Sequence, residues 1–140
     1  MKILLLTIGK IKSKPLLELV NDYSERIGHY TTLEMASAVD ERSALMKLQP
    51  NDFLIVCDER GKQKTSKGMS DFVKEHQLRG TKRLVFFIGD AEGNSSRARD
   101  RAHLLLALSL MTLPHEMATV LLLEQLYRAF TIIKGEPYHK

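Results

Sequence analysis

Apolar runs of strand length recur along the chain and alternate with stretches in which apolar residues follow helical spacing. A continuous apolar run is typical of a strand buried on both faces of a parallel sheet. One further segment alternates loosely between apolar and polar residues, which also favours a strand. We therefore expect strands at residues 2–8, 31–39, 53–57, 84–88 and 104–110.

Helices are expected between these strands. Pro15 suits the first turn of a helix that Gly28 would stop. Asp40 is a candidate N-cap and Gly80 a helix end. The expected helices cover residues 15–27, 40–48, 66–78, 95–102 and 115–133. This alternation indicates an α/β fold with a mostly parallel sheet. Because no repeat or linker interrupts it, residues 1–140 are expected to form a single domain.

The last of these helices carries apolar residues around most of its circumference. An ordinary surface helix has one apolar stripe. Here Met117, Val120, Leu121, Leu126 and Ile132 point in many directions. A sheet covers only one side of a helix, so the remaining face needs a second partner, for which another copy of the same helix is the simplest choice. We therefore predict a homodimer formed through this helix.

Composition restricts the class of protein without identifying it. The chain is 44% hydrophobic and has a single cysteine, Cys57, which excludes a disulfide framework and a thiolate metal cluster. No segment approaches the roughly 18 uninterrupted apolar residues of a membrane span. These features predict a soluble, cytoplasmic protein that does not interact with membranes. The formal net charge of +4 is compatible with a nucleic-acid partner but does not require one.

Three loops follow expected strands and are candidates for a ligand site. They contain Gly61, the segment 89–93 and the segment 111–115. Open parallel sheets bind ligands beyond the carboxyl ends of their strands, so convergence of these loops would form a cleft. The glycine loop 89–93 lacks the lysine of a phosphate-binding P-loop, and by itself it reads equally well as a turn.

Basic residues also follow several strands. They are lysines 10, 12 and 14, lysines 62, 64 and 67, and arginines 97, 99 and 101. Solvated surface charge is the usual role of such residues, and a rim that contacts phosphates is the alternative.

The final helix has polar residues with ordinary interpretations of their own. His115 is expected to cap the helix. Glu124 and Arg128 are spaced for a stabilising ion pair. The histidines and the cysteine show no metal-ligand spacing, so no metal is expected.

Taken together, the motifs resemble one family across nearly the whole chain. These motifs are MKILLLTIGKIK, DYSERIGHY, LSLMTLPHEM, LLLEQLYRAF and the terminal KGEPYHK. They resemble the RlmH family of SPOUT-class methyltransferases, and the pattern from Met111 to His139 is the most specific part. The resemblance implies an S-adenosylmethionine-dependent enzyme that methylates N3 of a pseudouridine in 23S ribosomal RNA, as free RNA or in the assembled ribosome.

The resemblance also implies a structure and a set of site residues. The implied fold is a trefoil-knotted α/β domain that dimerises through its last helix. The implied residues that bind S-adenosyl-L-methionine are Cys57, Gly89, Leu108, Ser109, Leu110, Met111, Thr112 and Leu113. On the RNA side, His139 would be the general base that removes the N3 proton, because its ordinary pKa lies near physiological pH. Arg128 would stabilise the developing anion or bind a phosphate, and Tyr138 would stack on or hydrogen-bond to the target base.

The chain departs from the family pattern at Asp90, where a second glycine is usual. Asp tolerates a positive φ better than most residues, so the turn is expected to survive. A carboxylate at this position leaves an alternative function open, namely a non-catalytic RNA-binding dimer of the same fold with impaired cofactor binding.

Overall fold

The computed structural model describes residues 1–140 and contains one five-stranded sheet. Every strand pair in the sheet is parallel. The strands are β1 (Lys2–Ile8), β2 (Thr32–Ala38), β3 (Asp52–Gln63), β4 (Arg83–Ile88) and β5 (Leu104–Ala107), in the spatial order β2-β1-β4-β3-β5. The helices are α1 (Lys14–Gly28), α2 (Glu41–Leu45), α3 (Ser66–Arg79), α4 (Ser96–Arg101) and α5 (His115–Lys134). The expected α/β fold and the order of its strands and helices are confirmed, although β5 ends at Ala107 instead of residue 110 and α2 is shorter than the expected helix 40–48.

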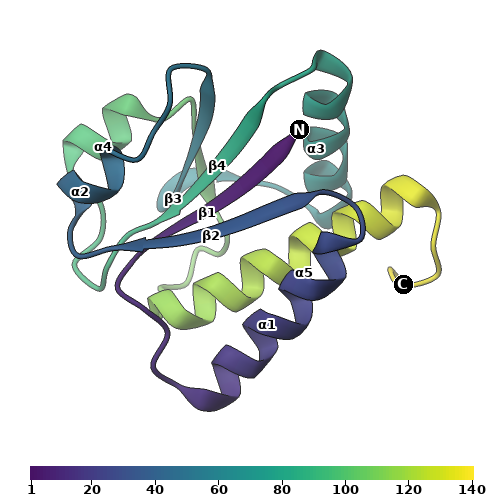
Figure 1. Cartoon of the computed structure of the whole chain (residues 1–140), viewed down its shortest axis with the longest axis horizontal. Helices are drawn as coiled ribbons and strands as arrows, with labels where there is room; N and C mark the ends of the chain where they lie inside the picture. The colour runs from purple at the N-terminus through teal and green to yellow at the C-terminus, as the bar shows by residue number, and fades with distance from the viewer.

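The helices form two unequal layers on the sheet. The long helices α1, α3 and α5 cover one face, and the short helices α2 and α4 cover the other (Figure 1). Side chains of β1 alternate between the two faces: Ile3 and Leu5 join the core beneath the long helices, and Leu4 and Leu6 join the core beneath the short ones. This burial on both faces explains why the strands are continuous apolar runs. None of the helices has the length and apolarity needed to cross a membrane.

Contacts with other elements of the same chain bury part of the apolar circumference of α5. The helix packs on the sheet and against both α1 and α3, which lie on either side of it (Figure 1). Leu122, Leu123, Leu126 and Phe130 are buried in this way. The expectation that residues outside the sheet-facing side need a second chain was therefore wrong for these residues, because α1 and α3 cover them. A narrower apolar surface remains, in which Met117 is 47% exposed and Leu121 is partly exposed.

Strand β3 extends farther than its apolar run predicts. Residues 58–63 are polar and were expected to form a loop, yet they remain in the strand. Leu106 of β5 pairs with Cys57 and also with Lys62, so the polar segment returns to β5 after an irregularity. Gly61 makes this return possible because a Cβ there would lie 2.4 Å from the backbone carbonyl carbon of Leu105. Backbone contacts that join β3 to β5 cannot be read from hydropathy.

Helix boundaries agree with the expected caps except at two ends. The side chain of Asp40 accepts a backbone hydrogen bond at the N-terminus of α2, and Gly80 ends α3 with φ of 77°. Thr65, which was not predicted as a cap, does the same at the N-terminus of α3. Gly28, however, is the last residue of α1 and lacks a positive φ. His115 is also not an N-cap: Pro114 precedes the helix without a side-chain cap, and His115 is its first residue.

Candidate active site

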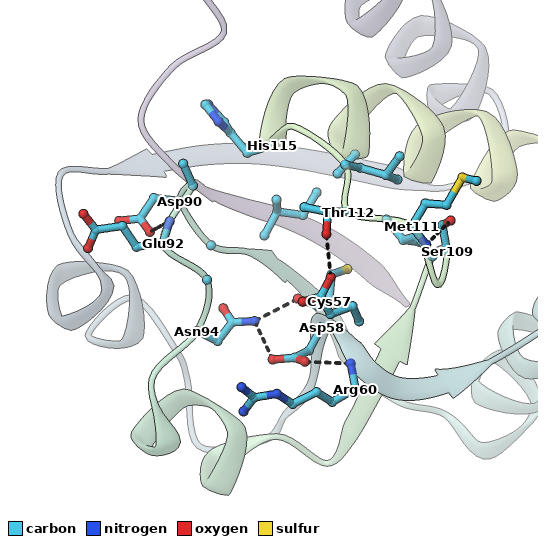
Figure 2. Close-up of a pocket in the computed structure, with 18 of the residues that line it drawn as sticks. Cys57, Asp58, Arg60, Asp90, Glu92, Asn94, Ser109, Met111, Thr112 and His115 are labelled. Carbon is cyan, nitrogen blue, oxygen red and sulfur yellow. Dashed lines mark hydrogen bonds between the residues drawn. The ribbon is translucent and has the colours of Figure 1, made fainter.

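A cavity of about 270 Å³ opens at the carboxyl ends of β3, β4 and β5 (Figure 2). Residues 58–60 after the apolar part of β3, residues 89–94 after β4 and the loop after β5 line it, together with His115 and Ala118 of α5. Two of the three predicted loops, 89–93 and 111–115, therefore converge here, whereas the third contribution comes from residues 58–60 of the extended strand β3 and Gly61 does not line the cavity. The convergence follows from the parallel sheet, because the carboxyl ends of neighbouring strands share one edge.

Most of the residues expected at the cofactor site meet at this cavity. Seven of the eight line it, namely Cys57, Gly89, Leu108, Ser109, Met111, Thr112 and Leu113. The exception is Leu110, which does not line the cavity and is 73% exposed. The side chain of Cys57 is a poor nucleophile because burial, with a contribution from Asp58, raises the pKa of its thiol to about 12.

Two side-chain contacts connect the loops around the cavity. The Asn94 amide donates to the backbone oxygen of Cys57 at 2.9 Å and to Asp58 Oδ2 at 3.2 Å (Figure 2). Thr112 Oγ1 donates to Glu59 Oε2 at 3.0 Å. The end of β3 is thus connected to the glycine loop on one side and to the loop before α5 on the other.

Asn94 has a second feature that sequence analysis missed. Its Oδ1 is buried and has no hydrogen-bond partner. A buried acceptor without a partner is costly, and such atoms are common where a ligand completes the structure. The sequence signal was only an asparagine directly after Gly93, and neither composition nor spacing separates it from a turn residue.

In the glycine loop 89–93, Asp90 does not adopt the positive φ that was considered for it. Its side chain Oδ1 accepts from the Glu92 backbone N–H at 3.0 Å, and its carbonyl oxygen accepts from the Gly93 N–H at 3.0 Å. The positive φ of this turn lies at Gly93, at 83°, and no residue other than glycine has one. Asp90 therefore stabilises the turn as an acceptor for backbone N–H groups rather than by adopting a left-handed conformation.

The residues expected on the RNA side form a separate cluster near the C-terminus. Gly135 has a φ of 70° and ends α5, after which the chain turns back toward the helix (Figure 1). Tyr30 on the segment after α1 donates to Glu136 Oε2 at 2.6 Å and fixes the beginning of the tail. Arg128 Nη1 then lies 3.0 Å from His139 Nδ1, and Tyr138 packs edge-on against Tyr127.

Glu124 is at the centre of this cluster. Its carboxylate pairs with Arg128 at 2.9 Å, as the helical spacing predicted, and also accepts from Tyr138 Oη at 3.0 Å. The hydrogen bond from Arg128 to Glu124 raises the pKa of the guanidinium. Burial, with hydrogen bonds to Tyr23 and Glu124, raises the pKa of the Tyr138 hydroxyl well above its usual value. Sequence analysis assigned Glu124 only a helix-stabilising role and so missed its contact with the tail.

The cavity and the tail cluster lie at different positions along α5, the cavity at its first turn and the cluster around Glu124 and Arg128. His115, the first residue of the helix, lines the cavity, whereas Arg128 is thirteen residues farther along. A rise of 1.5 Å per residue separates the two positions by about 20 Å. None of Arg128, Tyr138 and His139 lines the cavity. One chain therefore does not bring its own tail to its own cavity.

The three basic segments differ in what their side chains contact. Lys67 pairs with Asp71, Lys64 lies over the ring of Phe72, and Arg99 donates to the carbonyl oxygen of Asn94. The lysines of the segment 10–14 are exposed, as are Lys62, Lys64 and Lys67, but the side chains of the former make no ion pair or hydrogen bond, and Glu116 fixes the backbone of the segment. Glu116 Oε1 accepts from the backbone N–H groups of Lys12 and Ser13, both at 3.0 Å, which lowers the pKa of the Glu116 carboxyl.

Comparison with known proteins identifies the family of the chain. A family model described as "Predicted SPOUT methyltransferase" matches residues 1–139. The chain belongs to the SPOUT methyltransferase family. This confirms the resemblance seen in the motifs and makes the chain a methyltransferase that uses a methyl donor.

Several relatives in the family match the chain over its full length. The chain is 38% identical over 159 aligned residues, covering all of both chains, to ribosomal RNA large subunit methyltransferase H of Clostridium beijerinckii. It is 40% identical over 152 residues, covering 99% of each chain, to the protein of that name from Geotalea daltonii. It is 41% identical over 140 residues, covering all of both chains, to that from Coprothermobacter proteolyticus.

A solved structure shares the fold at low sequence identity. A probable methylase family protein from Haemophilus influenzae Rd KW20 superposes with a TM-score of 0.56 and 12% identity, covering 99% of this chain and 70% of that chain. At this identity the likeness supports the fold and carries no information about the substrate.

Proposed function

We propose that the chain transfers a methyl group from S-adenosyl-L-methionine to N3 of a pseudouridine in 23S ribosomal RNA. The full-length relatives are named as methyltransferases of the large-subunit RNA. The observation that carries the proposal is the meeting of seven expected cofactor residues at one cavity. An RNA substrate of this kind places the proposed reaction in the cytoplasm.

The residues around the cavity suit this methyl donor. S-adenosylmethionine supplies a methyl group already activated on a positively charged sulfur. Asp58 and Glu59 provide carboxylates that favour a cationic ligand, and the buried Oδ1 of Asn94 is an acceptor without a partner. Leu108 and Leu113 add apolar surface for a planar base. These residues would bind the donor and exclude water around the methyl group.

The tail cluster would supply the chemistry at the target base. N3 of a pseudouridine carries a proton that must leave before the nitrogen becomes an effective nucleophile. His139 would take this proton, Arg128 would stabilise the negative charge that develops on the imide, and Tyr138 would hold the base. The structure brings these three side chains together around Glu124.

We infer that the working enzyme is a homodimer, because a separation of about 20 Å along α5 prevents one chain from assembling both halves of the site. A two-fold axis across α5 would place the tail of each chain at the cavity of its partner. Exposed apolar side chains at the cavity end support such contact: Leu110 is 73%, Met111 is 78% and Met117 is 47% exposed. Leu110 would then belong to the dimer contact rather than to the cofactor site.

The proposed trefoil knot has indirect support. In the family's fold, one part of the chain threads through a loop formed by another. Here residues 58–63 return to β5 so closely that Gly61 meets the Leu105 backbone, and Leu106 is the partner of both Cys57 and Lys62. This close approach of β3 and β5 is compatible with such a crossing.

The experiment that tests the proposed function is methylation of RNA from a strain that lacks the corresponding enzyme. Purified protein is incubated with labelled S-adenosylmethionine and either free 23S RNA, large subunits or whole ribosomes, and the product nucleoside is identified by mass spectrometry. We expect one N3-methylated pseudouridine in at least one of these substrates. No methylation of any substrate, with calorimetry showing no binding of the donor, would instead support the non-catalytic RNA-binding dimer.

A further inference from the structure

The side chains around Glu124 use nearly all the hydrogen-bonding capacity of its carboxylate. Arg128 donates to it from Nε and from Nη2, the latter at 2.9 Å. Tyr138 Oη and the Gln125 amide donate to the same carboxylate at 3.0 and 2.9 Å. Its side chain is 17% exposed and that of Arg128 is 23% exposed. The guanidinium is therefore fixed on two of its three nitrogens, and only Nη1 faces the tail.

The contact between Arg128 and His139 indicates which nitrogen of the histidine ring is the acceptor. A guanidinium has five N–H donors and no acceptor. Because Arg128 Nη1 lies 3.0 Å from His139 Nδ1, Nδ1 must be the acceptor and carries no proton. In a neutral imidazole the proton is then on Nε2. The ring nitrogen of His139 that carries an accepting lone pair is thus Nδ1, and an Arg128 N–H donates to it.

This pair of side chains matches the edge of the proposed substrate. The imide edge of a pseudouridine presents the N3–H donor between two carbonyl acceptors. Nδ1 of His139 is an acceptor beside a guanidinium donor, and the two are within hydrogen-bonding distance of each other. The imide can therefore replace the internal contact with two new ones, N3–H to Nδ1 and Arg128 N–H to the neighbouring carbonyl oxygen.

We propose that Glu124 is a positioning residue. It holds Arg128 so that an Arg128 N–H donates to His139 Nδ1, the position that the N3–H of the target base takes when the substrate binds. His139 Nδ1 is then the atom that removes the N3 proton. The inference rests on the proposed function, since it names the proton acceptor of that reaction. Glu124 itself touches neither the base nor the donor. It orients Arg128 and Tyr138 together, which connects all three residues expected on the RNA side.

Proton loss from N3 precedes methyl transfer to the same nitrogen. The N3 proton moves to Nδ1, and the electron pair of the N–H bond stays on N3. N3 then forms a bond to the methyl carbon, and the pair of the carbon–sulfur bond remains on sulfur. The products are N3-methylpseudouridine, S-adenosylhomocysteine and an imidazolium, which later releases its proton to water. Arg128, held by Glu124, is positioned to stabilise the anion formed between proton loss and methyl transfer.

The first measurement uses the wild-type protein and needs no substrate. Nitrogen-15 NMR of the labelled histidines reports which ring nitrogen carries the proton, and the signal of His139 is assigned with His139→Gln. The inference expects the Nε2–H tautomer in the neutral ring. A predominant Nδ1–H tautomer would overturn it, because Arg128 would then have no acceptor.

The second measurement compares Glu124→Gln with a matched variant. Gln keeps the size of the side chain but holds Arg128 less firmly, so His139 is expected to populate both tautomers. We expect kcat to fall about tenfold to a hundredfold, as for other misplaced catalytic groups, with KM for S-adenosylmethionine unchanged. The control is Glu75→Gln, which disrupts the exposed Glu75–Arg79 pair of the same spacing on α3 and should change neither quantity.

Different results would contradict the positioning role of Glu124 and the proposed methylation of RNA. A Glu124→Gln protein that keeps the wild-type tautomer and the wild-type kcat would overturn the positioning role while leaving RNA methylation intact. A wild-type protein that methylates no RNA would refute the proposed function and, with it, the proton step. Circular dichroism and thermal unfolding of both variants show whether Glu124→Gln is folded, and the wild-type tautomer decides the assignment of Nδ1 in either case.

Discussion

Gly61 connects the polar end of β3 to β5 through the absence of a side chain. A Cβ there would lie 2.4 Å from the Leu105 carbonyl carbon and 2.7 Å from the Leu106 nitrogen, both backbone atoms. Gly61→Ala should therefore lower the free energy of unfolding in urea by about 1–3 kcal/mol, as other overpacking changes do. Gly28→Ala is the control, because nothing lies within 4 Å of its Cβ position. The helix propensity of alanine should make that variant more stable by up to about 1 kcal/mol. Equal stability of the two variants would show that β5 accommodates a methyl group at residue 61.

Asn94 connects the glycine loop to the end of β3, so its loss should weaken binding of the methyl donor. In Asn94→Leu the backbone oxygen of Cys57 and the Asp58 carboxylate lose their shared donor. With about 1 kcal/mol for each hydrogen bond, we expect the Kd for S-adenosylmethionine to rise about tenfold to a hundredfold in calorimetry. Asn21→Leu, at an exposed position of α1, should leave the Kd unchanged. An unaltered Kd in Asn94→Leu would mean that the loops hold their positions without this side chain.

The arrangement of elements shows which parts of this protein were accessible to sequence reasoning. The strands could be predicted because the helical layers bury both faces of the sheet, which requires continuous apolar runs such as 2–8 and 84–88. The extension of β3 was missed because residues 58–63 are polar and are held by backbone pairing, which leaves no hydropathy pattern. Asn94 and Glu124 were missed for a related reason: each acts through contacts with residues distant in the sequence.

The segment 10–14 between β1 and α1 is the basic element best suited to contact RNA. Its lysines are exposed, and Glu116 fixes its backbone beside the start of α5, whose first residue lines the cavity. The variant in which Lys10, Lys12 and Lys14 are all changed to Gln should bind RNA more weakly, with a reduced dependence of affinity on salt concentration. The corresponding change of Lys62, Lys64 and Lys67 should have a smaller effect, because Lys64 and Lys67 already contact Phe72 and Asp71. Filter binding at several salt concentrations measures both, and equal slopes in the two variants would contradict the assignment.

The packing of α3 on the sheet makes stability depend on pH through His76. The residue is 2% exposed, and its ring contacts Phe53 and Phe72. Burial, with a contribution from Arg79, lowers the pKa of His76 below its usual 6.5. The unfolded chain therefore binds a proton at His76 more readily than the folded one, so the free energy of unfolding should fall as the pH drops below 6.5. Urea unfolding should show a smaller fall for His76→Gln than for the wild type, and parallel curves would exclude this residue as the cause.

The proposed dimer assigns the two halves of each site to different chains, and mixed dimers test this directly. His139→Ala removes the proposed base, and Gly89→Val obstructs the cavity, because a Cβ at Gly89 would lie 2.6 Å from Asn94 Oδ1. Co-expression of the two variants with different affinity tags, followed by purification on both tags, isolates mixed dimers. If the partner supplies the tail, one of the two sites combines an intact cavity with an intact tail, and the dimer should retain about half of wild-type activity.

The reciprocal pairing separates this arrangement from one in which each chain uses its own tail. Here one subunit is wild type and the other carries both His139→Ala and Gly89→Val. With exchanged tails, each site contains one damaged half, so this dimer should be inactive. With each chain using its own tail, the wild-type subunit would keep a complete site, and the same dimer would retain about half of its activity, while the first mixed dimer would have none. The two arrangements thus predict opposite activities for the same pair of preparations. A separation of about 20 Å along α5 favours the exchange of tails.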